Sequence, residues 1–382
     1  MNRLVTIAAA SLLAVGCTDG LPTDVYSAAV DGVAFDIPSG LGRGSGRITV
    51  MTRNIYVGAN VDRILSAPLS EIPTLVSEAF QEFLSTDLAS RMAELALEIE
   101  QTEPHLIGLQ EVSLLQAFFP TGVQQFDFLG ILMSAIADRG LDYRLVAQIK
   151  DTDVLLPADP TVFPGLFGVR LVDSDAVLAR GDVETSNVEE RNYQAKLVVP
   201  GTGLEVLRGF AAVDARVGRR TYRFVTTHLE PVPVPPLLPI QLAQAQELVL
   251  ALSGETLPII ITGDFNTPAH LGRDNAPTYD LMLDAGYIDV WTRRARGLDD
   301  PGFTCCHDLA LRNPTPAFDQ RIDLVFARNP AALPPKGLAG VVNAIIVGDE
   351  QETRDLFGLW PSDHGGVAAR LQMPVPTDVG GR

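Results

Sequence analysis

The stretch Ile259-Ile-Ile-Thr-Gly-Asp-Phe-Asn-Thr-Pro268 decides how the fold of this chain is interpreted. Its isoleucines are typical of a buried strand, which ends before Pro268 because proline has no amide hydrogen to donate. Side chains two apart in a strand share a face, so we expect Asp264 and Asn266 at the carboxyl end, where open sheets place their ligands. Such a pair suits a metal-assisted hydrolytic site. An Asx-turn that closes a core strand explains this segment equally well.

Composition indicates one large globular domain or two ordinary ones. The chain has 382 residues, of which 46% are hydrophobic and 20% charged, and this balance favours a packed core over disorder. The net charge of −18 argues against a protein that holds nucleic acid through a broad basic surface. An acidic chain can still be an enzyme whose site takes its positive charge from a bound cation.

The first 17 residues are similar to a bacterial export signal. Arg3 precedes a mostly apolar run, Leu4 to Val15, which is too short to span a bilayer as a helix. The small residues before Cys17 resemble a lipoprotein cleavage site, although Ala14 stands where the usual pattern has leucine. We expect either acylation of Cys17 and a lipid anchor, or ordinary secretion. Both alternatives place the protein outside the cytoplasm, in the cell envelope or beyond it.

The remaining chain is predicted to hold one domain. Residues 18–45 are polar and rich in glycine, which predicts a flexible linker, residues 46–373 form the domain, and residues 374–382 are a polar tail. Strands are expected at 47–55, 105–112, 143–150, 175–180, 191–199, 204–216, 222–229, 259–264, 320–326, 341–347 and 363–371. Helices are expected at 61–66, 72–101, 124–139, 240–252 and 277–285, and loops at 151–168, 231–239 and 291–318. This order favours two mixed sheets packed face to face with helices outside.

Two further cysteines, Cys305 and Cys306, are adjacent in the sequence. They can form a vicinal disulfide or stay buried and reduced. His307 next to them suggests a metal, but three consecutive residues cannot all reach one tetrahedral ion, and no second Cys/His pair lies elsewhere. A structural zinc site is therefore not expected.

Polar side chains recur at the ends of the predicted strands. They are Asn54, Glu111, His228, Asp264 with Asn266, Asp323, and the Asp363–His364 pair. A buried charge costs roughly several kcal/mol unless it is paired or bound to a metal. Convergence of these strand ends on one rim of the sandwich would explain why the fold tolerates them.

The motifs TRNIYVG, LIGLQEV, DAVLAR, TTHLE, ITGDFN, RIDLVF and SDHGGV occur in this order. Together they resemble the endonuclease/exonuclease/phosphatase superfamily, which includes deoxyribonucleases, abasic-site endonucleases, inositol-phosphate 5-phosphatases and bacterial sphingomyelinases. The resemblance covers roughly residues 47–373. It implies a four-layer α/β/β/α sandwich and an enzyme that hydrolyses a phosphodiester or phosphomonoester by attack of water on phosphorus, with Mg²⁺ or with Mn²⁺ or Ca²⁺.

The resemblance implies a metal site of oxygen ligands. Glu111 is expected to be the principal ligand with Asn54 close by, and Asp363 is expected near the metal. A carboxylate and an amide oxygen suit Mg²⁺, which keeps several waters. An Asp that some relatives carry two residues after the Asn is absent here, so metal binding near Asn54 depends mostly on Glu111.

The same resemblance implies catalytic roles for five residues. Asp264 would orient or deprotonate the attacking water, and Asn266 would hold the scissile phosphate or a metal-bound water. His228 would donate to a phosphate oxygen. His364 would stabilise the developing charge or transfer a proton, and Asp323 would fix its tautomer.

Substrate contacts are less specific in the sequence. Arg53 and Arg180 are candidates for contact with an anionic substrate, or equally for surface ion pairs. Tyr193 is a candidate for the phosphate-side tyrosine of some relatives by order alone. His105 stands where many relatives have Asp, and we interpret it as a strand-start residue without a catalytic role.

The substrate class stays open between a lipid, a small molecule and a nucleic acid. The acidic balance and the apolar loops at 161–167 and 231–239 favour a phosphoester other than long nucleic acid. An extracellular nuclease that acts on DNA or RNA is the alternative, and the basic cluster near 291–298 favours it. A non-catalytic binding protein on the same fold is a further alternative, against which the intact motifs argue. No protein partner is implied, and membrane contact would come only through an acylated Cys17.

Overall fold

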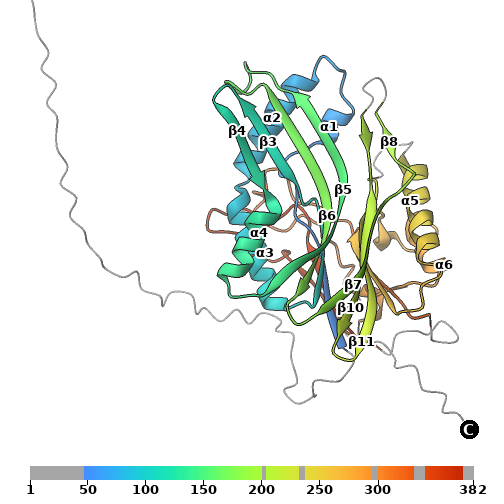
Figure 1. Cartoon of the computed structure of the whole chain (residues 1–382). Coiled ribbons are helices and arrows are strands. Elements are labelled where there is room, and N and C mark those ends of the chain that lie inside the picture. The colour runs from blue at the N-terminus through green and yellow to red at the C-terminus, as the bar shows by residue number, and fades with distance from the viewer. Residues whose placement is uncertain are drawn as a thin grey trace, which may run out of the picture. The chain divides into compact units, whose positions relative to one another are not determined.

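The computed structural model describes residues 47–199, 204–231, 237–294, 297, 299–330 and 340–372. In this part of the chain two mixed β-sheets pack face to face, and helices flank the outer sides of the sheets (Figure 1). The predicted four-layer α/β/β/α sandwich is confirmed. The predicted signal, linker and polar tail lie outside the described residues, as do residues 232–236 of the proline run. No helix of the described part is long and apolar enough to cross a membrane.

The first sheet has eight strands in the order β15-β16-β1-β2-β6-β3-β4, and β5 pairs with β6 beside that path. β1 and β2 are parallel, whereas β16 pairs with β1 and β6 with β2 in antiparallel fashion. The strands of this sheet are β1 (Arg47–Asn54), β2 (Leu106–Gln110), β3 (Leu114–Phe119), β4 (Gly122–Asp127), β5 (Tyr143–Pro157), β6 (Gly168–Arg180), β15 (Gly340–Val347) and β16 (Gly366–Gln372).

The second sheet has six strands in the order β13-β14-β12-β11-β10-β7. β11 and β12 are parallel, and β14 pairs with β12 in antiparallel fashion. Its strands are β7 (Glu184–Asn192), β10 (Gly209–Val217), β11 (Arg220–His228), β12 (Ile259–Asp264), β13 (Ile288–Asp289) and β14 (Asp323–Arg328). A separate two-stranded ladder joins β8 (Leu197–Val198) to β9 (Glu205–Val206).

The helices fall into two groups, one beside each sheet (Figure 1). Beside the first sheet lie α1 (Asp62–Leu65), α2 (Ile72–Ser85), α3 (Leu88–Thr102) and α4 (Phe128–Asp138), and beside the second lie α5 (Leu237–Ala251) and α6 (Pro277–Asp284). Short 3₁₀ turns are η1 (Ala269–Leu271), η2 (Trp291–Arg293) and η3 (Gln351–Thr353). Asp87 and Asp127 cap α3 and α4 by accepting hydrogen bonds from the first-turn amides of Ser90 and Gly130.

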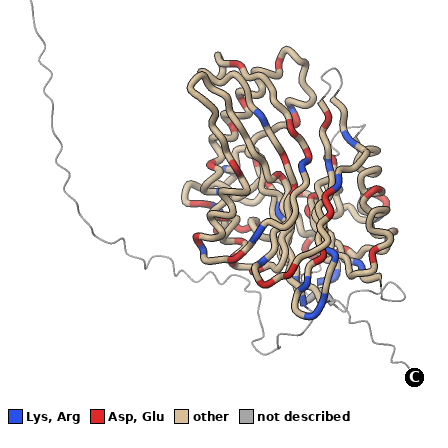
Figure 2. The backbone as a smooth tube through the Cα atoms, viewed as in Figure 1, with Lys and Arg blue, Asp and Glu red and all other residues tan. Residues whose placement is uncertain are grey.

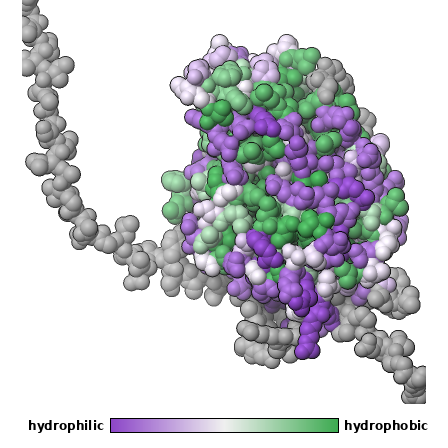
Figure 3. Space-filling model, in the orientation of Figure 1, coloured by the Kyte–Doolittle hydropathy of each residue, from purple (hydrophilic) through white to green (hydrophobic). Residues whose placement is uncertain are grey.

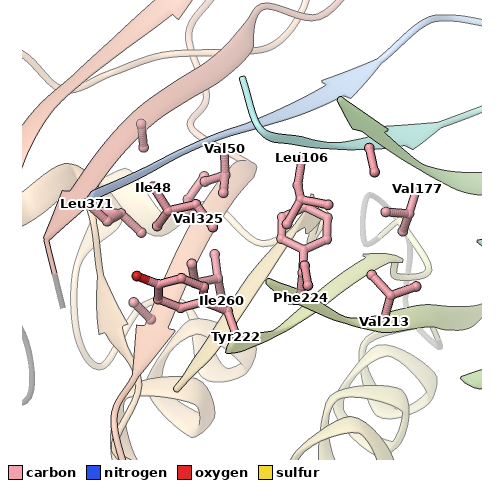
Figure 4. Packing of buried hydrophobic residues seen from close by; sticks show 14 of the residues in the cluster. Ile48, Val50, Leu106, Val177, Val213, Tyr222, Phe224, Ile260, Val325 and Leu371 are labelled. Carbon is pink, nitrogen blue, oxygen red and sulfur yellow. The ribbon is translucent and has the colours of Figure 1, made fainter. Parts of the chain in front are cut away.

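The core between the sheets is made of aliphatic and aromatic side chains from both inner faces (Figure 4). Near the rim where the polar strand ends were predicted to converge, this core becomes polar. Gly108 lets the two sheets approach each other closely there. A Cβ at Gly108 would lie 2.2 Å from Thr262 Oγ1 and 2.5 Å from Thr226 Oγ1. Gln110 Nε2 donates to Thr226 Oγ1 at 2.9 Å, which ties β2 to β11 directly beneath the site. The polar side chains of this layer are buried but keep their hydrogen bonds, so the layer supports the strand ends above it.

Several predictions of local structure are wrong. The helix expected at 72–101 is two helices, α2 and α3, and the strand expected at 191–199 is the end of β7 followed by the short β8. Residues 124–127 belong to β4 and only residues 128–138 are helical, because the preceding segment forms a hairpin with β3, which the sequence interpretation missed. Residues 151–157 are the second half of β5, where a long loop was expected. Proline and glycine after residue 156 masked the two-residue alternation of burial in Thr152–Leu156, where the half-buried positions share one face.

Candidate active site

Strand register brings the predicted residues of the second sheet together. His228 at the end of β11 pairs with Asp264 at the end of β12, and Asp264 pairs with Asp323 at the start of β14. In the first sheet, Asn54 at the end of β1 pairs with Gln110 at the end of β2. Both groups therefore lie at the same rim of the sandwich, as the pattern of strand ends predicted.

Asn54 joins the two halves of this rim. Its Nδ2 donates to Glu111 Oε1 at 3.0 Å and to Asp264 Oδ2 at 3.2 Å. Its Oδ1 accepts from the Tyr56 amide at 3.0 Å, and Glu111 Oε2 accepts from the Val57 amide at 2.7 Å. The loop after β1 thus holds Glu111, the predicted metal ligand at the first sheet, close to Asp264, the predicted catalytic carboxylate of the second sheet.

The strand ends reach these positions through left-handed backbone turns. Tyr56, Glu111 and Asn266 have φ values of 61°, 59° and 49°, which non-glycine residues adopt rarely. Asn266 therefore does not continue the strand with Asp264, contrary to expectation. Its backbone amide donates to Asp264 Oδ1 at 2.9 Å in an Asx-turn, and its Nδ2 donates to the Leu229 carbonyl at 2.9 Å, 3.2 Å from His228 Nε2. Asp264 and Asn266 therefore form an Asx-turn and also belong to the candidate site. The turn places the side-chain amide of Asn266 next to His228.

His364 stands among carboxylates. Its Nδ1 lies 2.9 Å from Asp323 Oδ2 and 3.8 Å from Asp264 Oδ2. Burial acts to lower its pKa, but the negative charges of Asp323, Asp363 and Asp264 outweigh burial and raise the pKa of His364 well above its usual value. The short contact is a hydrogen bond from the ring to Asp323, which leaves Nε2 free to carry a second proton.

His228 stands beside a cation. Arg208 Nη1 lies 2.9 Å from His228 Nδ1. Because a guanidinium can only donate, Nδ1 is the acceptor and the ring proton is on Nε2, which lies 3.6 Å from Asp264 Oδ2. Burial, then Arg208, then His364 lower the pKa of His228 well below its usual value. His228 is thus a neutral donor that points into the site.

Three carboxyl groups of the site, those of Asp264, Glu111 and Asp363, have raised pKa values. Burial first and the charge of Asp323 second raise the pKa of Asp264 to about 7. Burial and the charge of Asp363 raise the pKa of Glu111, likewise to about 7. A carboxylate with a pKa near 7 is a stronger base than an exposed one and still ionises near neutral pH, which is the tuning that proton transfer needs.

Buried polar contacts hold the His364 segment in place. Arg53 forms a salt bridge with Glu98 at 2.9 Å and also donates to the His364 carbonyl. Ser362 Oγ donates to the Asn54 carbonyl at 2.8 Å and accepts from the His364 amide. Arg53 is 1% exposed, so this position corrects its interpretation as a substrate contact. It is a buried anchor for the backbone.

The structure does not bring Arg180 and Tyr193 to the site. Arg180 ends β6, beyond the pair formed by Ala179 and Leu106 at the opposite end of β2, and it binds Asp182 at 2.7 Å. Tyr193 is buried in the core between the second sheet and α5, where its hydroxyl lies 2.8 Å from Thr227 Oγ1. Arg180 therefore forms an ion pair, which was the alternative to substrate contact, and Tyr193 is buried with its hydroxyl engaged. Neither position supports a contact with substrate.

Sequence reasoning missed several residues that shape the site. Ser362 and Glu230 lay inside quoted motifs, SDHGGV and TTHLE, and so carried a detectable signal. Arg208 carried none, because it precedes β10 in a segment without a motif. Asp173 lies on β6 close enough for its charge to raise the pKa of Glu111.

The adjacent cysteines lie on a segment that braces the site. Cys305 and Cys306 are joined by a disulfide. Thr304 Oγ1 accepts from the Asp323 amide at 3.1 Å, and the His307 amide donates to the Asp363 carbonyl at 2.8 Å. The sulfur atoms approach His364, but disulfide sulfurs are not thiolate ligands, so this group is not a metal site.

Comparisons with known proteins bear on the family and the fold. The profile of the Endonuclease/Exonuclease/phosphatase family matches residues 59–364. Family proteins of known structure from Leptotrichia buccalis, Bacteroides thetaiotaomicron and Beutenbergia cavernae are 15%, 16% and 19% identical, with TM-scores of 0.52, 0.51 and 0.51. Each match covers 86% of this chain, and 100%, 98% and 72% of the other chain. At such identities the likeness shows the fold alone. No curated protein matches the sequence significantly.

Proposed function

Since this chain belongs to the endonuclease/exonuclease/phosphatase family, we propose that it hydrolyses a phosphoester with the help of a divalent cation. The observation that carries the proposal is the convergence of Glu111, Asn54, Asp264 and two differently charged histidines on one rim. Hydrolysis at phosphorus needs a base for water, donors for phosphate oxygens and positive charge, and this rim offers each of them.

The residues on the first-sheet side fit a hard cation. Asn54, Glu111 and Asp363 would hold it, with oxygen atoms that Mg²⁺, Mn²⁺ or Ca²⁺ prefers. Neither Glu111 nor Asp363 forms a salt bridge with a lysine or arginine of the described chain, and the charge of Asp363 raises the pKa of Glu111. A bound cation would supply positive charge to a phosphate oxygen and to these carboxylates. The cluster of Asp264, Asp323 and His364 is a poorer cation site, because His364 and Asp323 already share a hydrogen bond.

Asp264 is the proposed base for the attacking water. Its Oδ1 accepts from the Asn266 amide, and its Oδ2 faces Asn54 and both histidines. These contacts fix the direction of the carboxylate, so a water bound to it is oriented before reaction. The pKa of about 7 lets Asp264 take a proton near neutral pH.

The two histidines are proposed to have different roles in the reaction. His228, neutral and protonated at Nε2, would donate to a phosphate oxygen together with the Asn266 amide. His364, with Asp323 on Nδ1, would stabilise the charge that develops on the phosphate and deliver a proton from Nε2 to the leaving oxygen.

A phosphoester other than long nucleic acid is the favoured substrate class. Lys and Arg are scattered among Asp and Glu over the described chain, and a basic group occurs at the β10–β11 turn (Figure 2). Arg220 begins β11 and His228 ends it, so this turn is at the far end of the strand from the site. Arg294, from the other basic cluster, stacks on Trp291 at 3.4 Å from the ring centre, and Arg296 lies outside the described residues.

We also propose that residues 1–17 direct export and that Cys17 is acylated, with residues 18–45 as a linker. The support is the sequence pattern alone, since these residues lie outside the described part. Mass spectrometry of the protein purified from membranes of a bacterial host tests it. An N-terminal diacylglyceryl-Cys17 is expected, and a mature chain that begins elsewhere without lipid would refute acylation.

The activity is tested with a panel of phosphoesters, each assayed with Mg²⁺ and with EDTA. The panel contains bis-p-nitrophenyl phosphate, sphingomyelin, inositol phosphates, RNA and plasmid DNA. We expect EDTA-sensitive hydrolysis that Asp264→Asn lowers by about 10³-fold or more, because the variant removes the base. Asp284→Asn, an exposed aspartate on α6, is the matched control and should retain full activity. Chelator-resistant hydrolysis, or none on any substrate, would refute the proposal.

A further inference from the structure

A mostly apolar cavity of about 140 Å³ opens beside the candidate active site. Phe80 and Phe83 of α2 line one side, and Val154 and Leu156 of β5 with Leu171 of β6 line another. The loop after β1 and helix α1 complete the wall. The cavity therefore lies between the first sheet, its covering helix and the loop that also shapes the site.

One end of the cavity is polar and is shared with the site. Arg208 and Glu230 line this end, and Arg208 contacts His228 Nδ1 at 2.9 Å. Val57 also lines the cavity, and its amide donates to Glu111 Oε2 at 2.7 Å. Arg208 and Val57 therefore contact both the site and the cavity, so a ligand whose phosphate lies between His228 and Glu111 would have the cavity next to it.

The apolar walls are incompletely covered by the protein. Val154, Leu156 and Leu171 are half-buried, and Leu155 and Phe167 nearby are 60% and 53% exposed. Hydrophobic residues reach the surface at the upper end of the molecule, near α1 and the ends of β3–β6 (Figure 3). Side chains that face an empty space forgo dispersion contacts, so an apolar occupant would gain them.

We propose that the substrate carries an apolar alkyl, acyl or aryl group beside its phosphate, and that this group occupies the cavity. The inference rests on the proposed phosphoesterase function and specifies its substrate class. An engineered apolar cavity of about 150 Å³ holds a benzene molecule, so a cavity of 140 Å³ accommodates about six carbon atoms. The polar end places the phosphate at the rim and the apolar end selects the substituent.

The walls disfavour a nucleobase as the occupant. A base has polar edges that need hydrogen-bond partners, and burying them unpaired weakens binding. The side chains Phe80, Phe83, Val154, Leu156 and Leu171 offer no such partners. The polar lining consists of Thr152, Arg208 and three carboxylates, Asp62, Asp173 and Glu230, and the carboxylates add negative charge beside a base. An alkyl or aryl group has no polar edge and meets no such cost.

Binding of n-alkylphosphonates tests the inference without requiring turnover. Isothermal titration of the full chain with Mg²⁺ would compare methyl-, butyl-, hexyl- and octylphosphonate. We expect affinity to rise by about fourfold per methylene, because each buried CH₂ contributes about 0.8 kcal/mol, and to level off beyond about six carbons. A rise that continues to octyl also supports an apolar subsite and assigns a lipid chain to it. Equal affinities along the series would overturn the inference and leave the proposed function standing.

Adjacent residues of β5 supply a matched pair of variants. Leu156→Gln places an amide in the cavity, whereas Leu155→Gln alters the next side chain, which points outward. Leu156→Gln should make affinity depend less on chain length and keep the affinity for methylphosphonate. Leu155→Gln should leave the chain-length dependence and the affinity for methylphosphonate unchanged. Val154→Gln replaces Leu156→Gln if that variant does not fold. Unchanged dependence in the cavity variant contradicts the inference. Failure of every phosphonate to bind would refute the phosphate site of the proposed function, and the inference with it.

Discussion

His364 and His228 are both buried, and one ring nitrogen of each lies within 4 Å of Asp264 Oδ2, at 3.8 Å and 3.6 Å. Their pKa values nevertheless move in opposite directions, upward for His364 and downward for His228. Burial lowers both. The difference comes from the charged neighbours: Asp323, Asp363 and Asp264 raise the pKa of His364, whereas Arg208 and His364 lower the pKa of His228.

Because burial acts on both rings in the same direction, the charge of the neighbours decides how the two histidines differ. His364 is held as a cation that can give up a proton, and His228 as a neutral ring that can only offer a hydrogen bond. Asp264 lies between them and interacts with both. A phosphoester in the same space would therefore meet an acid on one side and a neutral donor on the other.

The largest expected effect comes from replacing each histidine by glutamine. His364→Gln should lower kcat/KM by about 10³-fold, because an amide cannot carry charge or transfer a proton. His228→Gln should lower it by about tenfold or less, because an amide N–H can replace a neutral ring N–H. Both are measured at pH 7.5 with Mg²⁺ on whichever phosphoester of the panel is turned over, with circular dichroism to check folding. Equal losses, or the larger loss at His228, would contradict the assigned charge states.

Asp323→Asn tests the cause of the difference. Loss of the carboxylate should lower the pKa of His364 and reduce kcat by about 10- to 100-fold, since the ring keeps its place but loses its charged partner. The pKa is measured by NMR titration of the metal-free protein, in which His228 is an internal control that should not titrate near neutral pH. An unchanged His364 titration would show that Asp363 and Asp264 alone hold its charge.

The contacts of His364 were predictable from sequence, and those of His228 were not. His364 and Asp323 belong to motifs of fixed order, and both follow from the rule that polar strand ends meet at one rim. Arg208 lies in the short connection between β9 and β10, where no periodicity or motif marks it. Its approach to His228 depends on how that connection folds over the end of β11, which is a tertiary effect.

The same limit explains what else was missed. The two sheets and the rim follow from strand patterns, whereas the second half of β5 was hidden by the prolines and glycines that follow it. Val154 and Leu156 on that segment line the cavity, so the apolar subsite could not be inferred before the strand was known. Arg53 is the converse case, because its motif position suggested substrate contact and its burial with Glu98 excludes it.

His105 shows what burial does in the absence of a carboxylate partner at hydrogen-bond distance. It lies at the opposite end of the first sheet, where its Nδ1 accepts from the Thr49 amide at 3.1 Å. Burial first and Arg180 second lower its pKa to about 4. The pKa of His105 is lowered, like that of His228. Only the raised pKa of His364 requires neighbouring carboxylates.

The smallest expected effect is therefore on stability at this remote histidine. A folded pKa below the unfolded value of about 6.5 means that His105 contributes stability that is complete above pH 6.5 and is lost as pH falls towards about 4. Between pH 7.5 and pH 5.5 this linkage removes about 1 kcal/mol from the free energy of unfolding. His105→Gln, which can still accept from Thr49, should show a pH dependence weaker by that amount in urea unfolding at both pH values. An identical pH dependence in the two proteins would mean that burial alone does not shift a histidine of this fold, and the low pKa of His228 would then rest on Arg208.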